Sequence, residues 1–317
     1  MRATVRPLLA AAAVFAVGVA AQAAPTGEQL LRHSKEAERN HSYRGARISR
    51  MYFPKYTVTA TSHVIHRRPD TTRIEYLAPA PLSGTIMLQI GQDRWRRHPR
   101  EGGWRRAAEA PDSDALNLLM RNYILRVGQG AEVAQRECLL LVVAPRHDGN
   151  PSKRMWIDRA TGLVLRTELL NWKQENISTS AFREIEIDPD LSDHSALLTP
   201  PKPPQAPPAP VALGFQPIHP QYVPSGYEFI GTSTTAIGGY PAAHLRYTDG
   251  LNTISLFQAP AKAFAQETPF GATELSFTQV ITWRRGNMAY ALMGDVNPAE
   301  LRRMADSVGP SVGIRMR

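Results

Sequence analysis

The spacing of apolar residues is helical at the start of the chain and strand-like over most of its remaining length. Thr26 and Gln29 have the spacing of a capping box ahead of Leu30 and Leu31, which predicts a helix that ends near Arg39. Alternation of apolar and polar residues then predicts strands over 57–65, 72–77, 85–90, 94–98, 138–143, 154–158, 163–171 and 180–187. Helical spacing of apolar residues returns over 112–125 and predicts a second helix there. Strands joined by short turns, with few helices, predict an α+β fold with antiparallel sheets.

A proline-rich stretch divides the chain. Residues 199–210 hold seven of the 26 prolines and have few backbone donors, so we expect a stiff, extended linker. It separates a domain at 24–198 from a smaller one at 211–317. Alternation in the second domain predicts strands over 227–234, 243–248, 253–258, 278–284 and 288–293. Asn297 as N-cap and Pro298 after it predict a closing helix.

The N-terminus predicts export. Arg2 and Arg6 precede an apolar run from Leu8 to Ala21, and Ala-Gln-Ala23 follows, which is typical of a signal peptide over residues 1–23. No other stretch approaches the roughly 20 apolar residues that a membrane span needs. The formal charge is +9, but an exported chain does not meet DNA or RNA. Nucleic acid is therefore not expected as a partner.

The sequence lacks the motifs of catalytic and metal sites. The single cysteine, Cys138, excludes an intramolecular disulfide and a multi-thiolate metal site, and its apolar neighbours predict a buried, inert thiol. His63 and His66 fall on opposite faces of a predicted strand, and the acidic run from Glu184 to Asp193 alternates as a solvated strand face would. We predict no catalytic residues, no metal and no cofactor.

One cluster of basic residues is denser than the charge elsewhere in the chain. A predicted hairpin carries arginines and tryptophans on both arms, and its candidate binding residues are Arg96, Arg97, Arg105 and Arg106. Gathered guanidinium groups suit the phosphate of a lipid or the carboxylates of an acidic peptide. The alternative is an exposed hairpin that arginine keeps soluble.

Six short segments carry a resemblance to a known family. In chain order they are Ser42–Gly45, Val64–Arg67, Thr72–Leu77, Trp156–Arg166, Pro224–Tyr227 and Arg246–Phe257. Taken in succession, they resemble the N-terminal and then the C-terminal domain of the RseB/MucB regulators of sigma-E. The resemblance spans nearly the whole mature chain.

This resemblance implies a fold and a function. The expected fold is a LolA/LolB-like half-barrel, a curved antiparallel sheet with helices over an apolar cavity, followed by a smaller antiparallel domain that ends in a helix. The expected function is that of a non-enzymatic periplasmic regulator in the envelope stress response. Such a protein binds the periplasmic segment of a membrane anti-sigma factor, shields it from regulated proteolysis and senses lipid-like signals.

Candidate residues follow from the resemblance together with the apolar pattern. For a lipid in the first domain they are Leu30, Ile86, Leu88, Ile90 and Leu119. For docking of the anti-sigma segment they are Tyr247, Asp249, Leu251 and Phe257, where Asp249 and the following glycine form a turn or bulge rather than a catalytic group. The arginine hairpin is assigned a secondary contact with an acidic peptide or a lipid phosphate.

Two other functions stay open at this point. A periplasmic lipid or lipoprotein carrier of the LolA/LolB type would use the first domain alike but gives no reason for the second. A secreted hydrolase would need a nucleophile and a base that the sequence does not indicate. The pattern leaves open which lipid or lipopolysaccharide binds, which anti-sigma factor is the partner, and whether the chain forms a homo-oligomer.

Overall fold

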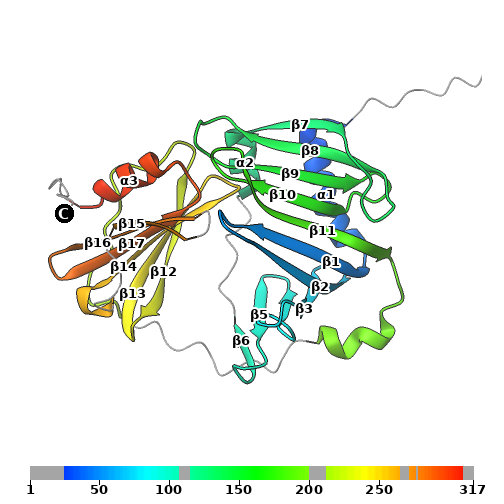
Figure 1. Ribbon diagram of the computed structural model, residues 1–317, viewed down its shortest axis with the longest axis horizontal. Coiled ribbons are helices and arrows are strands. Elements are labelled where there is room, and N and C mark those ends of the chain that lie inside the picture. Colours follow the sequence, from blue (N-terminus) through cyan, green and yellow to red (C-terminus); the bar gives the residue numbers. More distant parts are fainter. Residues whose placement is uncertain (1–24, 107–114, 200–211, 265–270, 276–277, 310–317) are drawn as a thin grey trace, which may run out of the picture.

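The computed structural model describes residues 25–106, 115–199, 212–264, 271–275 and 278–309, which form two antiparallel sheets with few helices (Figure 1). The predicted signal peptide, residues 1–23, lies outside the described residues, as does the predicted linker apart from Thr199. None of the described helices combines the length and the apolar character that a bilayer crossing requires.

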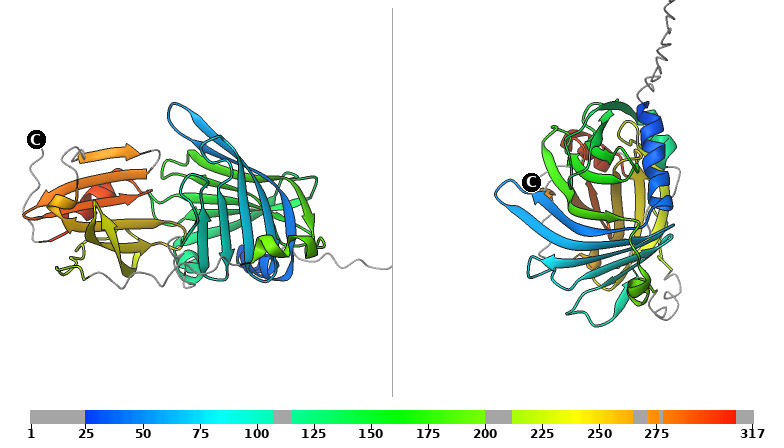
Figure 2. Two further views of the ribbon diagram at one scale, coloured as in Figure 1. Left: turned by 90° about the horizontal axis from the view of Figure 1, so that it is seen from below. Right: turned by 90° about the vertical axis from the view of Figure 1, so that its right-hand side faces the viewer.

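The larger sheet has eleven strands in the order β6-β5-β4-β3-β2-β1-β11-β10-β9-β8-β7. Its strands are β1 (Tyr43–Tyr52), β2 (Thr57–Arg67), β3 (Thr71–Ala78), β4 (Ile86–Ile90), β5 (Asp93–Arg97), β6 (Trp104–Arg106), β7 (Tyr123–Gln129), β8 (Cys138–Pro145), β9 (Ser152–Asp158), β10 (Val164–Leu170) and β11 (Asn176–Ile187). Two meanders of sequential strands therefore meet where β1 pairs with β11, and the sheet curves strongly (Figure 2).

Helix α1 (Gly27–Asn40) covers one face of this sheet at β7 and β8. The Thr26 hydroxyl accepts a hydrogen bond from the Gln29 N–H, and the Gln29 side chain accepts one from the Thr26 N–H, so the predicted capping box is confirmed. The helix buries Leu30 and Leu31 against the sheet. A short 3-10 helix, η1 (Ser192–Leu198), packs near β3.

The second helix is shorter than its sequence pattern predicts. We expected a helix over 112–125, of which 112–114 lie outside the described residues. Helix α2 (Ala115–Asn122) ends before the predicted boundary, and Tyr123 begins β7. Residues 123–129 pair with β8, so hydrogen bonding across the sheet replaces the last helical turn. The apolar residues Leu119 and Tyr123 still enter one cluster, because a helix that runs directly into a strand can keep both on the buried side.

Strand β1 was not predicted. Its sequence, YRGARISRMY, carries four positions occupied by Arg or Gly in ten residues, and its burial is intermediate over most of its length. Long-range pairing on both sides, with β2 and with β11, fixes this segment as the centre of the sheet. At Gly45, an added Cβ would lie 2.3 Å from the backbone oxygen of Glu184, so the close approach of β11 requires glycine.

The smaller sheet has six strands in the order β12-β13-β14-β17-β16-β15. They are β12 (Glu228–Ile237), β13 (Tyr240–Thr248), β14 (Thr253–Pro260), β15 (Gly271–Leu275), β16 (Thr278–Arg285) and β17 (Met288–Gly294), with a 3-10 turn η2 (Ala261–Ala263) after β14. Helix α3 (Pro298–Asp306) begins at the predicted N-cap, where the Asn297 side chain accepts a hydrogen bond from the Ala299 N–H. Its apolar face packs on the sheet through Leu301 and Met304.

The fold class predicted from the sequence is confirmed. The chain folds into a curved antiparallel sheet with helix α1 on one face, followed by a smaller antiparallel sheet that ends in a helix (Figures 1 and 2). Each sheet has its own buried apolar clusters. The turn between β13 and β14 reaches across, since Leu251 packs against the cluster around Tyr123 and Leu141 of the larger sheet.

Candidate binding site and domain interface

The five residues predicted to bind lipid lie on two faces of the larger sheet. Leu30 and Leu119 share one cluster between the sheet and α1, which we call the α1 side. Leu88 pairs with Arg73, which pairs with Ile65, and paired residues of antiparallel strands share a face. Ile65 packs with Leu191 and Leu198 around η1, on the opposite face, which we call the η1 side.

Strand alternation fixes the other two members of the set. Ile86 and Ile90 lie two residues either side of Leu88 and therefore also face the η1 side. Met87 pairs with Ile74, which packs in the cluster around Ala37 of α1, so Met87 is the β4 residue aligned with the α1 side. The structure thus joins Leu30 with Leu119 and separates both from the β4 residues.

The α1 side also holds buried and half-buried polar groups. The His66 ring stacks on Tyr43 with centroids 4.8 Å apart, and its Nε2 lies 2.6 Å from the backbone oxygen of Glu38. Burial lowers the pKa of Arg47 and of Lys153, because desolvation penalises a charged cation. The Arg47 Nε has no hydrogen-bond partner. An apolar cluster on the same face as half-buried cations suits an amphipathic molecule with an anionic group.

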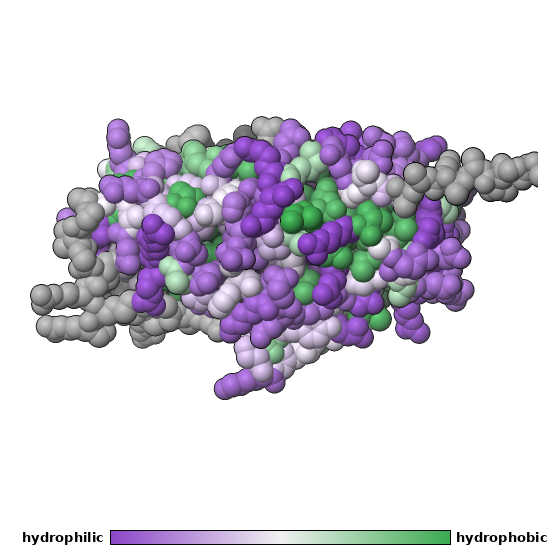
Figure 3. All heavy atoms as spheres, turned by 90° about the horizontal axis from the view of Figure 1, so that it is seen from above, coloured by the Kyte–Doolittle hydropathy of each residue, from purple (hydrophilic) through white to green (hydrophobic). Residues whose placement is uncertain are grey.

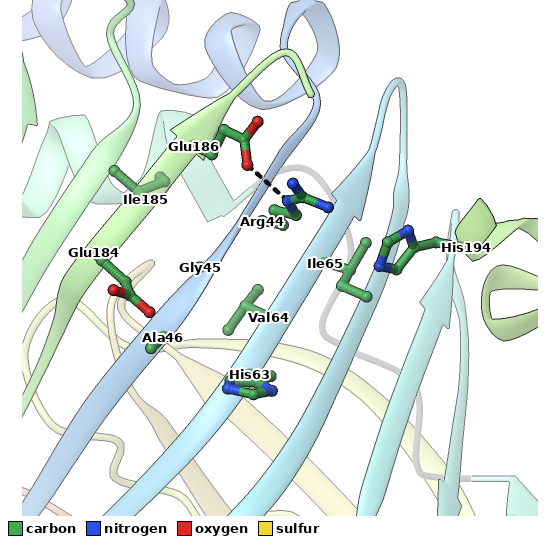
Figure 4. A pocket seen from close by; sticks show the side chains of 10 residues that line it. All are labelled: Arg44, Gly45, Ala46, His63, Val64, Ile65, Glu184, Ile185, Glu186 and His194. Carbon is green, nitrogen blue, oxygen red and sulfur yellow. Dashed lines mark hydrogen bonds and ion pairs between the residues drawn. The ribbon is translucent and has the colours of Figure 1, made fainter. Parts of the chain in front are cut away.

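A pocket of about 400 Å³ with a mixed polar and apolar lining opens on the η1 side (Figure 4). The Arg44 Nε donates a 2.7 Å hydrogen bond to Glu186, and His63 and His194 lie along the pocket with Ile65 between them. The Nδ1 atom of His194 is buried without a hydrogen-bond partner. Because Glu186 and His63 are exposed, this is a solvated groove, and its lining residues include no paired nucleophile and base.

The predicted arginine hairpin is present, but acids partly neutralise it. Strands β5 and β6 place Arg96 opposite Arg105. Glu101, in the turn, lies 2.7 Å from the Arg96 guanidinium and 3.6 Å from that of Arg105. Arg106 pairs with Asp93 at 2.5 Å, and Arg97 lies over the Trp104 ring at 5.7 Å. Its charge is therefore lower than the arginine count indicates.

The residues predicted for partner docking turn inward. Asp249 is 0% exposed and Tyr247 is 2% exposed. Phe257 is half-buried and stacks on His244 with centroids 4.2 Å apart, and Leu251 packs into the first domain. In this conformation Asp249 and Leu251 hold the two sheets of their own chain together.

Asp249 is the centre of this domain interface. Its Oδ2 accepts a 2.6 Å hydrogen bond from the Tyr123 hydroxyl and a 3.4 Å contact from the Asn150 amide, both in the larger domain. Its Oδ1 accepts hydrogen bonds from the N–H groups of Leu251 and Asn252 at 2.8 and 2.7 Å, which shapes the β13–β14 turn. One carboxylate thus fixes its own turn and binds the other domain.

Hydrogen bonds to backbone carbonyl groups extend the interface. The Asn122 amide donates to the carbonyls of Gly226 at 2.7 Å and of Asp249 at 3.0 Å. The Asn297 N–H donates to the Gly149 carbonyl at 3.0 Å. Gly226 has φ +86°, and a Cβ there would lie 2.9 Å from the Asn122 side chain, so this turn requires glycine for two reasons. The sheets are joined by a built interface as well as by the chain.

Sequence reasoning missed the first-domain half of this interface. Tyr123 was assigned to a helix face, and Asn122 and Asn150 were assigned no role. The Asp-Gly turn at 249–250 was recognised, but no local pattern indicates that its carboxylate meets a tyrosine 126 positions earlier in the chain. A single sequence therefore carries no signal for the pairing of Asp249 with Tyr123.

The domain interface should give stability a specific pH dependence. Burial raises the pKa of Asp249, and hydrogen bonds from Tyr123 and the β13–β14 turn offset this only in part. The folded chain therefore binds the proton more tightly than the unfolded chain, so this contribution is complete below the ordinary aspartate pKa and is lost as pH rises through the raised value. Denaturant unfolding across that window should show the stability of the parent chain, relative to Asp249→Asn, falling as pH rises. A pH-independent difference would contradict this.

Comparisons with known proteins identify both the family domain and the fold. The family model described as the MucB/RseB N-terminal domain matches residues 94–200. No curated protein matches the sequence. The structure matches a chain of the Pseudomonas aeruginosa MucA/MucB complex with a TM-score of 0.67 and 19% identity, over 90% of this chain and 99% of the other.

Two further solved structures give the same result. MucB in complex with MucA(peri) matches with a TM-score of 0.66 and 20% identity, over 90% of this chain and 100% of the other. MucB by itself matches with a TM-score of 0.60 and 20% identity, over 90% and 98% of the two chains. At these identities the matches establish a shared fold that includes both sheets.

Proposed function

Residues 94–200 match the MucB/RseB N-terminal domain, and from that premise we propose that the chain is a MucB/RseB family member, a non-enzymatic periplasmic regulator that binds the periplasmic segment of a membrane anti-sigma factor. In this proposal it shields that segment from regulated proteolysis and releases it in response to a lipid-like signal.

One observation carries the proposal. The match to MucB structures extends over 90% of the chain, and two of these structures are complexes with MucA, one of them with MucA(peri). A lipid carrier would need only the curved sheet, whereas here the second sheet is held to the first by the buried Asp249 and by Asn122. This arrangement supports a two-domain regulator over a carrier.

Residues on the α1 side support the proposal that the chain responds to a lipid-like signal. Leu30 and Leu119 provide an apolar wall, and Arg47 and Lys153 are half-buried cations that an anionic headgroup would stabilise. The residues Ile86, Leu88 and Ile90 face away from this region, so we now propose Met87 as the β4 contribution to it.

Capture of the partner tests the proposal. The tagged mature chain should retain from detergent-solubilised envelope membranes a membrane protein that co-purifies with a sigma factor. The purified periplasmic segment of that protein should then be cleaved at least about tenfold more slowly by its protease when the chain is present, and added anionic lipid should restore cleavage. Charge-reversal of the hairpin (Arg96→Glu with Arg105→Glu) should slow association more than it speeds dissociation, because exposed charges act mainly on the on-rate.

Two outcomes would contradict the proposal. Capture of lipoproteins alone, with acyl chains transferred to a second carrier, would favour the lipid-carrier function. Retention of a membrane partner that associates with no sigma factor, or whose cleavage rate the chain leaves unchanged, would remove the regulatory function.

A further inference from the structure

The hairpin between β1 and β2 extends beyond its neighbours. Pairing of β2 with β3 ends at Thr61 and Ala78, whereas pairing of β2 with β1 continues to Thr57 and Tyr52. The end of the hairpin therefore has no strand on its β3 side. Both views in Figure 2 show it projecting past the rest of the larger sheet.

The end of this hairpin exposes apolar and aromatic groups. We call residues 51–56, Met-Tyr-Phe-Pro-Lys-Tyr, the fingertip. Met51 is 50% exposed and Tyr56 is 60% exposed. The Phe53 ring stacks on Tyr56 with centroids 4.5 Å apart, and the Phe53 N–H donates to the Tyr56 carbonyl at 2.8 Å, which closes the turn. Pro54 is also exposed, so the apolar surface here is contiguous rather than scattered.

The charged side chains along the fingertip segment are all positive. Arg50 and Lys55 are exposed, and no acidic residue occurs between positions 50 and 57. Among the residues that the structure describes, neither cation makes an ion pair. Elsewhere on the same strand Arg44 is paired with Glu186. The free cations flank the exposed apolar side chains.

A second exposed apolar region lies elsewhere on the larger sheet. In the space-filling view from above, hydrophobic side chains gather over the edge formed by β7 and β8, with hydrophilic ones among them (Figure 3). Ile124 and Val142 on this edge are only half-exposed, and Arg154 beside them is paired with Glu168. The fingertip differs because its apolar groups protrude and its cations are unpaired.

We propose that the fingertip inserts into the headgroup layer of an anionic phospholipid bilayer. Tyrosine partitions to the interface between hydrocarbon and water, and lysine and arginine beside it reach lipid phosphates while their aliphatic stems stay in the apolar layer. A convex tip enters a deformable bilayer without a matching pocket, whereas a protein partner would have to supply one. This contact is additional to anti-sigma binding, which requires no bilayer contact from this chain.

Vesicle flotation of the full mature chain tests this directly. The chain should float with vesicles of phosphatidylglycerol and phosphatidylcholine and much less with phosphatidylcholine alone, and added salt should reduce flotation. Met51→Ser with Tyr56→Ser should lower the partition coefficient at least about tenfold, given the apolar area removed. A matched control, Leu197→Ser with Ile218→Ser, removes side chains that are 47% and 39% exposed elsewhere and should leave flotation unchanged.

A fluorescent variant separates the fingertip from lipid uptake on the α1 side. Because the parent chain already has five tryptophans, the readout is the difference in emission between Tyr56→Trp and the parent, which should show a blue shift and quenching by brominated lipid when intact vesicles are added. Equal flotation of parent and Met51→Ser/Tyr56→Ser chains, both folded by circular dichroism, would overturn the proposal. A parent chain that ignores vesicles while the double variant loses capture of a membrane protein would also overturn it, and would make the fingertip a protein contact.

Discussion

Replacing Asp249 with alanine should lower the free energy of unfolding by about 3 kcal/mol, a large fraction of the stability of a typical domain. The substitution removes the acceptor for the Tyr123 hydroxyl and for two backbone N–H groups of the β13–β14 turn. The Tyr123 hydroxyl is buried with Asp249 and the two N–H groups lie in a half-buried turn, so water replaces the lost hydrogen bonds only in part. Denaturant unfolding of the full mature chain measures the change.

Matched variants assign the effect to the interface between the domains. Tyr123→Phe removes one hydrogen-bond donor and leaves the turn intact, so it should lower the free energy of unfolding by less, about 1 kcal/mol. In a double-mutant cycle with Asp249→Ala, the two losses should not add, because they share one hydrogen bond. Small-angle scattering should show a wider distribution of domain orientations for Asp249→Ala alone. Additive losses with unchanged scattering would show that Asp249 acts only within its own turn.

Replacing Asp158, the last residue of β9, with alanine should also lower the free energy of unfolding by about 3 kcal/mol. Arg136 donates to both carboxylate oxygens of Asp158 at 3.0 and 2.9 Å, and the backbone N–H and hydroxyl of Thr161 donate to one of them. Asp158 is 3% exposed, so its loss leaves the guanidinium and the turn without an acceptor. Thermal and denaturant unfolding should both report it.

Two comparisons sharpen this test. Glu186→Ala breaks the exposed Arg44–Glu186 ion pair and should lower the free energy of unfolding by less than about 1 kcal/mol. Burial by itself raises the pKa of Asp158, but hydrogen bonds from Arg136 and Thr161 outweigh it and hold the pKa below the ordinary value. Its contribution is therefore present above the ordinary aspartate pKa and lost as pH falls, opposite in sign to that of Asp249. Equal costs for Asp158→Ala and Glu186→Ala would contradict the assigned role.

Local rules determined much of the architecture. The capping box at Thr26 and the Asn297–Pro298 start of α3 are made by neighbouring residues, so their sequence spacing is sufficient to predict them. The hairpin of β5 and β6 follows from a turn between two alternating runs for the same reason. The resemblance to the MucB/RseB family is confirmed over residues 94–200, which match the model of its N-terminal domain.

Only the tertiary structure decided how these elements are used. Alternation along β4 shows that Leu88 and Met87 face opposite ways, but long-range pairing through β3 and β2 decides that Met87 is on the α1 side. The sequence of the β13–β14 turn predicts an Asp-Gly bend equally well on a surface and in an interface. Its burial against Tyr123 arises because two segments far apart in the chain meet, and no local propensity encodes that meeting.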